Sequence, residues 1–281
     1  MIRILVDSSS DYSQEEVQEK GLVFVPIRIE LAGKEYLDGI DLERDRFFEL
    51  LQETGEFPMT SQPSPQEFLD IFQEVKEAGD DLVCILLSSH LSGTCQSARL
   101  ASQMMDYEDH IFIVDSRAAT YNIKVMADYA LELVHDGLSA AEIAERLEAF
   151  KSRVHVVAMI DTLEYLRRGG RIGKAAAVVG DLARIKPVIY VTPEGEIGLA
   201  GKALGKNKAI NMILKWIGEH PLDESFPAYS IYSYGTENSE VFEERLSREG
   251  IRFDERLQIG ATIGTHIGPG AFGFVYVEKE K

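Results

Sequence analysis

The feature that most restricts the fold is the alternation of short β-branched runs with amphipathic helical stretches in the first half of the chain. Buried strands are expected at residues 3–6, 23–29, 82–87, 111–114 and 155–159. Between them, the spacing of Leu, Phe, Ile and Ala predicts helices at 44–53, 65–78, 94–105, 118–135 and 140–152. Strands that alternate with helices are typical of a parallel sheet covered on both faces. Residues 1–160 are therefore expected to form an N-terminal three-layer α/β/α domain.

The pattern changes after about residue 160, where a Gly-rich basic segment, Arg-Arg-Gly-Gly-Arg, occupies residues 167–171. A hairpin-like pair of strands is expected at 187–191 and 197–199. Helices at 206–217 and 239–247 then alternate with strands at 228–234 and 274–277. Residues 161–281 are expected to form a C-terminal two-layer α/β domain with a mixed sheet.

The charge balance restricts the partners of the chain. Its 281 residues carry 29 Lys and Arg against 47 Asp and Glu, a net charge of −18, which disfavours nucleic-acid binding. The longest apolar run has six residues, 82–87, whereas a spanning helix needs roughly 20, so no transmembrane segment is expected. No secretory signal is recognised at the N-terminus, which favours a cytoplasmic protein. Cys84 and Cys95 lack metal-ligand spacing and are expected to be buried thiols.

Polar residues follow two of the expected strands. Residues 88–94, Ser-Ser-His-Leu-Ser-Gly-Thr, stand between a strand and a helix, and residues 7–11 read Asp-Ser-Ser-Ser-Asp after the first strand. The carboxyl ends of parallel strands face the ligand crevice, and a helix N-terminus favours an anion. Ser92 and Thr94 are also good helix-capping residues. Capping and ligand binding both remain open for them.

A second group of hydroxyl residues, Thr60, Ser61 and Ser64, precedes a helix that is expected to begin at Pro65. Hydroxyl side chains before a proline at the first helical position are most often caps. These residues would form part of a ligand site only if the fold brought other hydrogen-bond donors close to them.

Near the C-terminus, Gly268-Pro269-Gly270 predicts the end of a short helix, which places His266 in its last turn. Gly268, Gly270 and Gly273 match the letters of a dinucleotide motif, but no helix with an acidic residue about 20 positions further can follow. A nucleotide site is therefore rejected. His266 remains a candidate site residue or a histidine satisfied by packing.

A serine hydrolase is disfavoured, because a nucleophile elbow has glycine two positions before and after its serine. Ser92 instead has His90 and Thr94 at those positions. No spacing of His, Cys or acidic residues suggests a metal site, and none is expected.

Taken together and in this order, five segments resemble the DegV family of bacterial fatty-acid-binding proteins, the lipid-binding subunits of fatty acid kinase. The segments are 7–11, 60–64, 88–94, 163–172 and 263–273. The resemblance implies a non-catalytic subunit with one long-chain fatty acid in an apolar tunnel between two domains, and no cofactor. It also implies that a separate ATP-dependent kinase subunit converts the presented carboxylate to an acyl phosphate, used in phospholipid synthesis.

The resemblance also implies roles for individual residues. The carboxylate would be held by Thr60, Ser61, Ser92, Gly93, Thr94 and His266. His266 could supply a proton or a positive charge, because the ordinary pKa of histidine is close to neutrality. Arg171 would face the phosphoryl group or the kinase.

The chain departs from the family pattern at residues 115–122, where many members have a Gly-x-Gly, and this leaves the shape of the tunnel open. It also lacks an Arg that many members carry after Lys202, where docking of the partner could differ. A lipid carrier or sensor that acts without a kinase is the alternative function. A hydrolase that uses Ser92 is a second and weaker alternative.

Overall fold

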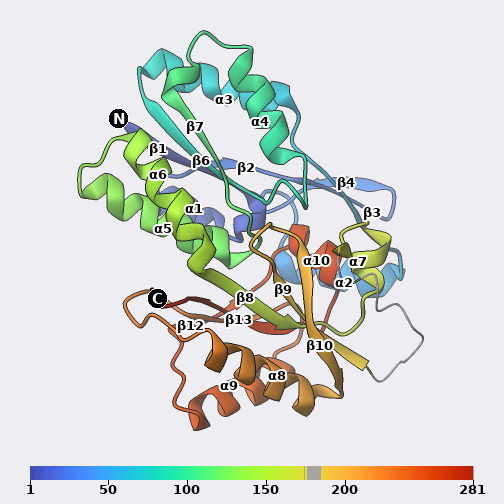
Figure 1. Cartoon of the computed structure of the whole chain (residues 1–281). Coiled ribbons are helices and arrows are strands. Elements are labelled where there is room, and N and C mark those ends of the chain that lie inside the picture. Colours follow the sequence, from blue (N-terminus) through green and yellow to red (C-terminus); the bar gives the residue numbers. More distant parts are fainter. Residues whose placement is uncertain (174, 176–184, 281) are drawn as a thin grey trace.

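The computed structural model describes residues 1–173, 175 and 185–280, and within them the chain forms two main β-sheets and one small one (Figure 1). The first sheet is parallel, has the strand order β2-β1-β6-β7, and consists of β1 (Ile2–Asp7), β2 (Val23–Val25), β6 (Asp81–Leu86) and β7 (Ile111–Asp115). The second sheet is mixed, with the order β10-β9-β8-β13-β11-β12. Its strands are β8 (Val154–Met159), β9 (Ile185–Val191), β10 (Ile197–Leu204), β11 (Tyr229–Tyr232), β12 (Glu255–Gln258) and β13 (Phe272–Val277).

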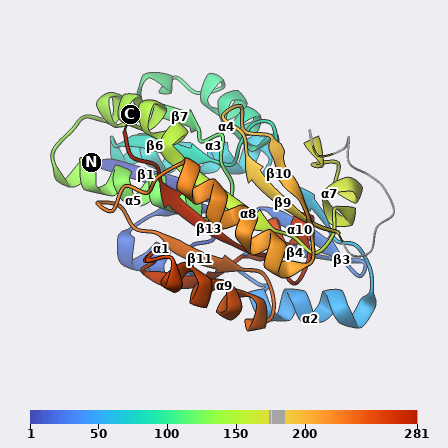
Figure 2. The ribbon, with the colours of Figure 1, turned by 60° about the horizontal axis from the view of Figure 1, so that its bottom comes forward.

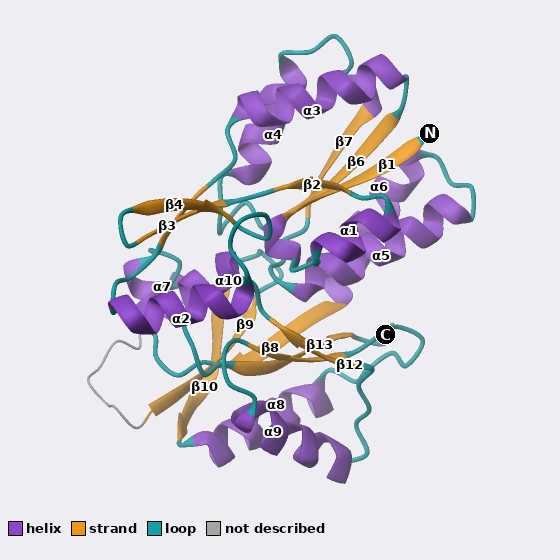
Figure 3. Cartoon of the chain, turned by 180° about the vertical axis from the view of Figure 1, so that it is seen from behind, coloured by secondary structure: helices purple, strands orange, loops and turns teal. Residues whose placement is uncertain are grey.

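Helices cover both faces of the parallel sheet. On one face, α3 (Pro65–Ala78) and α4 (Thr94–Gln103) bury Phe68, Phe72 and Ala98 against the strands. On the other face lie α1 (Gln14–Lys20), α5 (Tyr121–His135) and α6 (Ala140–Phe150) (Figure 3). This is the predicted three-layer arrangement.

The mixed sheet is covered on its outer face by α8 (Lys206–Glu219) and α9 (Glu237–Arg248), which lie side by side in Figure 2. Ile213 and Phe242 pack there against Phe274. The inner face of this sheet shares one continuous hydrophobic core with α5 and the parallel sheet. The predicted mixed α/β layer is confirmed, and the two sheets are joined by a common core.

Local sequence signals set the ends of several helices. Ser13 with Glu16, Ser64 with Glu67 and Ser139 with Glu142 form capping boxes. The cap of α3 is Ser64, with Pro65 in the first turn as predicted. The hydroxyl residues before Pro65 therefore have different structural roles, because Ser64 caps the helix while Thr60 lies in a strand.

The predicted strand 23–29 is wrong in one respect, because it is two strands in two sheets. Strand β2 ends before Pro26, which has no backbone N–H to donate to a ladder. After it, β3 (Arg28–Leu31) pairs with β4 (Lys34–Leu37) and β5 (Met59–Ser61) in a small antiparallel sheet.

The strand predicted at 155–159 exists as β8 but belongs to the mixed sheet, where it pairs antiparallel with β13 and β9. It is apolar on both faces, with Val156 in one core cluster and Val157 in the other. Such a run carries no signal for one sheet over the other. The division into residues 1–160 and 161–281 stays a prediction.

Helix α5 begins at Tyr121 rather than at residue 118 as predicted. Arg117 and Thr120 have φ values of 49° and 56°, which are incompatible with a right-handed helix. These two strained residues lie in the segment that departs from the family's Gly-x-Gly pattern. Glycine adopts such positive φ values without steric cost.

Cys84 and Cys95 are buried free thiols, as predicted. None of the helices in the described ranges is both long enough and apolar enough to span a lipid bilayer.

Candidate ligand-binding site

A cavity of about 250 Å³ lies where β5, the loop after β6, α7 (Glu164–Arg168) and α10 (Ala261–Ile267) come together. Its polar lining consists of Thr60, Ser61, Gln62, Ser92, Arg171, Thr262 and His266. Its apolar lining consists of Ile27, Leu87, Leu91, Ala119, Leu166, Ile197, Ile263 and Ile267. Five of the seven residues predicted from the sequence, Thr60, Ser61, Ser92, Arg171 and His266, therefore line one cavity.

Thr60 and His266 are in direct contact, although 206 positions separate them in the sequence. Thr60 Oγ1 lies 2.9 Å from His266 Nε2. Strand β5 holds Thr60 opposite Ile29, and His266 lies in the last turn of α10, which ends at Gly268 as predicted. The contact joins the small antiparallel sheet to α10.

The imidazole of His266 is enclosed by the protein. Its Nδ1 atom is buried and has no hydrogen-bond partner among the described residues. Gly169 lies directly against it, because a Cβ atom built on Gly169 would be 2.3 Å from Nδ1. Burial, with a smaller contribution from the positive charge of Arg171, lowers the pKa of His266 to about 4. His266 is therefore neutral at neutral pH, which corrects the expectation that it could supply a positive charge.

Arg171 supplies the positive charge at this cavity. Its Nε donates to the Leu91 carbonyl at 2.9 Å, and its Nη1 donates to the Gly169 carbonyl at 2.5 Å. These two bonds fix the guanidinium between the loop after α7 and the loop after β6. Within the described ranges Nη2 has no hydrogen-bond partner, so it can donate to an anion in the cavity.

Ser92 lies at the edge of the cavity, next to the start of α4. Its Oγ lies 2.8 Å from Thr94 Oγ1 and accepts a hydrogen bond from the Thr94 backbone N–H at 3.3 Å. The N-cap of α4 is Gly93 and has no side-chain hydrogen bond, so Ser92 accepts one backbone N–H of the first turn from outside the helix and also lines the cavity. Thr94 is buried behind Ser92 and supports it without being part of the cavity lining.

Gly93 also lies behind the cavity lining, where it makes room for Gln62. A Cβ atom on Gly93 would be 1.9 Å from Gln62 Oε1, and Gln62 Nε2 donates to Ser97 Oγ at 3.0 Å. Sequence reasoning missed Gln62 and Thr262 as lining residues. Gln62 belongs to the recognised 60–64 segment, which could have indicated it, whereas no local signal marks Thr262.

Two buried aspartates hold the N-terminus of α10, the helix that carries His266. Asp11 Oδ1 accepts from the Gly260 N–H at 2.9 Å, and Asp38 Oδ2 accepts from the Thr262 N–H at 3.1 Å. Carboxylates at this position pair with free backbone donors and with the positive end of the helix dipole. The 7–11 segment therefore has a structural role, because Asp11 holds the N-terminus of α10 and none of its residues lines the cavity.

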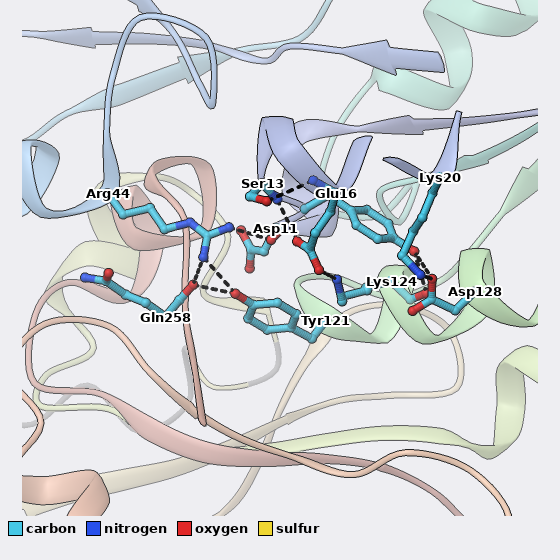
Figure 4. A network of polar contacts seen from close by, with 10 residues as sticks. Asp11, Ser13, Glu16, Lys20, Arg44, Tyr121, Lys124, Asp128 and Gln258 are labelled. Atoms are coloured by element: carbon cyan, nitrogen blue, oxygen red, sulfur yellow. Dashed lines mark hydrogen bonds and ion pairs between the residues drawn. The ribbon is translucent and has the colours of Figure 1, made fainter. Parts of the chain in front are cut away.

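Arg44 is the cation next to Asp11, and Figure 4 shows it with Asp11, Tyr121 and Gln258. Its guanidinium donates to the Asp11 carbonyl at 2.5 Å, to the Gln258 carbonyl at 2.9 Å and to the Tyr121 hydroxyl at 3.1 Å. Burial nevertheless raises the pKa of Asp11 to about 7 and that of Asp7 to about 6. Both groups are therefore easier to protonate in the folded protein than in the unfolded chain.

The raised pKa values predict a pH-dependent stability. The stabilisation that comes from the neutral carboxyl groups is fully present below about pH 4 and is lost as the pH rises through about 7, so their contribution to the free energy of unfolding should fall across this range. In Asp11→Asn, which retains an acceptor for Gly260, urea unfolding should show a shallower fall. Asp70→Asn, at an exposed carboxylate on α3, is the control and should keep the wild-type slope. Equal slopes for all three proteins would contradict a buried, titrating Asp11.

A smaller cavity of about 60 Å³ adjoins the first one on the inner face of the mixed sheet. The two cavities have four lining residues in common, Ala119, Ile197, Ile263 and Ile267. The remaining lining is largely aliphatic and includes Val156, Ile189 and Ile231. One end of the combined space is thus polar and the other apolar.

Comparison with known proteins gives consistent matches over the whole chain. A family model described as "Uncharacterised protein, DegV family" matches residues 1–279. A DegV domain-containing protein of Caldanaerobacter subterraneus subsp. tengcongensis is 33% identical over 283 residues, which cover 99% of each chain. A DegV domain-containing protein of Staphylococcus aureus is 30% identical over 281 residues, 98% of each chain.

Solved structures show the same fold. A DegV family protein from Thermus thermophilus, whose structure is described as one of fatty acid binding, is 34% identical to this chain and superimposes with a TM-score of 0.88. A stearic-acid-binding protein from Eubacterium ventriosum is 29% identical, also with a TM-score of 0.88. DegV of Bacillus subtilis, described as a fatty acid binding protein, is 29% identical with a TM-score of 0.85. In each comparison 99% of both chains is covered.

Proposed function

The chain belongs to the DegV family, and from this membership we propose that it binds one long-chain fatty acid and presents the carboxylate to a separate ATP-dependent kinase subunit. The observation that carries the proposal is the polarity of the two adjoining cavities. Hydroxyl, imidazole and guanidinium groups line one end, and aliphatic side chains line the other. This distribution matches a molecule with one anionic end and a long apolar tail.

The tail provides the driving force in this proposal. Burying about 15 methylene groups at about 0.8 kcal/mol each gives on the order of 12 kcal/mol before ordering costs. The methylene groups would pack against the aliphatic lining of the smaller cavity, which includes Ala119 and Ile231. In this proposal the tail runs along the inner face of the mixed sheet.

The head group needs hydrogen-bond donors, because a carboxylate that leaves water must be compensated. Thr60 and Ser92 offer hydroxyl groups, and Arg171 offers Nη2 and a positive charge. Neutral His266 fixes the Thr60 hydroxyl by their 2.9 Å contact. In this arrangement Arg171 neutralises the ligand while Thr60 and Ser92 set its position.

The presenting role is supported by the location of the polar end. Ser61 and Gln62 line the cavity and are themselves exposed at the surface. A carboxylate bound there lies near solvent, where a second protein can reach it. The kinase would transfer the terminal phosphoryl group of ATP to a carboxylate oxygen, which gives an acyl phosphate and ADP, and Arg171 would neutralise the developing charge.

Mass spectrometry of an organic extract from the purified protein is the first test of the proposed function. A stoichiometric long-chain fatty acid is expected from the wild type. Thr60→Val should retain it about ten- to hundredfold more weakly, because a donor to a charged group is lost. Thr54→Val, at an exposed helical threonine, should bind like the wild type. Extracts without fatty acid, or equal retention by both variants, would contradict the assignment.

The second test separates a kinase subunit from a lipid carrier. Lipid-loaded protein is combined with ATP and a candidate kinase subunit, and acyl phosphate and bound lipid are measured separately. Arg171→Gln is expected to reduce product formation more than lipid retention. Equal loss of both contradicts a role of Arg171 in phosphoryl transfer, and lipid binding without product for any kinase supports the carrier or sensor.

A further inference from the structure

A third cavity, of about 500 Å³, lies where two strands of the mixed sheet separate. The ladder between β8 and β9 ends at the pair of Val157 and Tyr190. Beyond that pair, Val154 and His155 on β8 and Val191 on β9 line opposite sides of the cavity. The sheet is therefore open at this place.

The lining of this third cavity is polar, unlike that of the small apolar cavity. Asn122 is 1% exposed and its Oδ1 atom has no hydrogen-bond partner among the described residues. Lys151 pairs with Glu148 at 2.6 Å, and His155 pairs with Glu278 at 2.7 Å. A hydrocarbon chain that entered this space would remove water from these groups without replacing its hydrogen bonds.

Val191 and Tyr190 line both the apolar and the polar cavity. Their side chains point to opposite faces of the sheet, as alternate residues of a strand do. Val191 packs against the core shared with the parallel sheet, whereas the Tyr190 ring lies 4.4 Å from that of Trp216 on α8. The side chain that separates the two cavities on the inner face is thus Val191.

Resting on the proposed function, we propose that Val191 is the stop at which the acyl chain ends, and hence a residue that determines which chain lengths the protein accepts. Each methylene packed before this stop increases affinity about fourfold. A methylene group beyond Val191 would enter the polar cavity and would not increase the affinity. Affinity should therefore rise with chain length up to one limit and then level off or fall.

The first experiment measures the affinity of the delipidated protein for saturated fatty acids that increase by two carbons. In Val191→Ala the two methyl groups removed leave apolar space for about two more carbons before the polar lining, so the length of highest affinity should increase by about two carbons. Val188→Ala removes the same atoms from the opposite face of β9, under α8, and should keep the wild-type limit. An unchanged limit in Val191→Ala, or the same shift in both variants, overturns the proposal.

The second experiment uses Trp216, the only tryptophan of the chain, which lines the polar cavity. A fatty acid with bromine on its terminal carbon should quench Trp216 fluorescence more than one with bromine next to the carboxylate. The difference should increase in Val191→Ala, where the chain end can approach the indole. Stronger quenching by bromine near the carboxylate overturns the proposal while leaving fatty acid binding intact, whereas failure to bind either acid contradicts the proposed function itself.

Discussion

Arg44→Met is expected to lower the free energy of unfolding by about 3 kcal/mol at about pH 8, because removal of one partner from a largely buried ionic network leaves the others uncompensated. Arg44 is bonded to the Asp11 carbonyl, to the Gln258 carbonyl and to the Tyr121 hydroxyl. It therefore joins α2 (Arg44–Thr54) to the loop after β1, to the start of α5 and to the end of β12. The methionine retains most of the aliphatic packing and loses the charge and the donors.

The pH dependence of this loss distinguishes the charge from the hydrogen bonds. Burial raises the pKa of Asp11 to about 7, so at about pH 5 this carboxyl group is neutral and needs no counter-charge. Urea unfolding should therefore show a smaller effect of Arg44→Met at about pH 5 than at about pH 8.

Arg46→Met is the matched control, two positions along the same helix. Arg46 is 48% exposed and pairs with Glu49 and Glu53 at the surface, where such pairs contribute about 0–1 kcal/mol. A loss for Arg44→Met no larger than that for Arg46→Met would show that the buried network is not a major source of stability.

Gly169→Ala is expected to weaken fatty acid binding about ten- to hundredfold, the cost of one misplaced hydrogen bond to a charged ligand. The backbone of Gly169 has φ −71°, which alanine adopts freely, so no backbone strain is introduced. The added Cβ would instead lie 2.3 Å from His266 Nδ1 and 2.8 Å from its Cε1 atom. The imidazole must move away and lose its contact with Thr60.

Gly218→Ala in α8 controls for the substitution itself, because a Cβ there meets no atom within 4 Å. It should bind fatty acid like the wild type and stabilise the helix by about 0.5–1 kcal/mol. Titration calorimetry of the delipidated proteins measures the affinities. If Gly169→Ala binds as tightly as Gly218→Ala, the position of His266 does not matter for the ligand.

Much of the fold was predictable because it depends on neighbouring residues. The cap at Ser64 and the proline after it fix the start of α3, and Gly268 ends α10 where predicted. The sheet to which β8 belongs was not predictable, because a strand that is apolar on both faces fits either sheet. The break of the second predicted strand at Pro26 was missed, although proline could have indicated it.

The candidate site was predictable only in part, and for a different reason. The resemblance to a family identified Thr60, Ser92, Arg171 and His266, while their spacing in the chain says nothing about their contact. Gly93 and Thr94 were included because they adjoin Ser92, yet they lie behind the cavity lining. Because Gly93 and Thr94 adjoin Ser92 in the sequence, they were correctly expected near the site. Adjacency does not show whether a residue lines a cavity or supports a residue that does.

The sequence by itself determined the start of α3 and the end of α10, the net charge and the order of the family motifs, because these depend only on residue types and short spacings. The tertiary structure alone decided that His266 is neutral, that Gly169 lies directly against its imidazole and that Val191 lines both an apolar and a polar cavity. The physical reason is that desolvation and steric contact arise only when segments far apart in the chain are packed against each other.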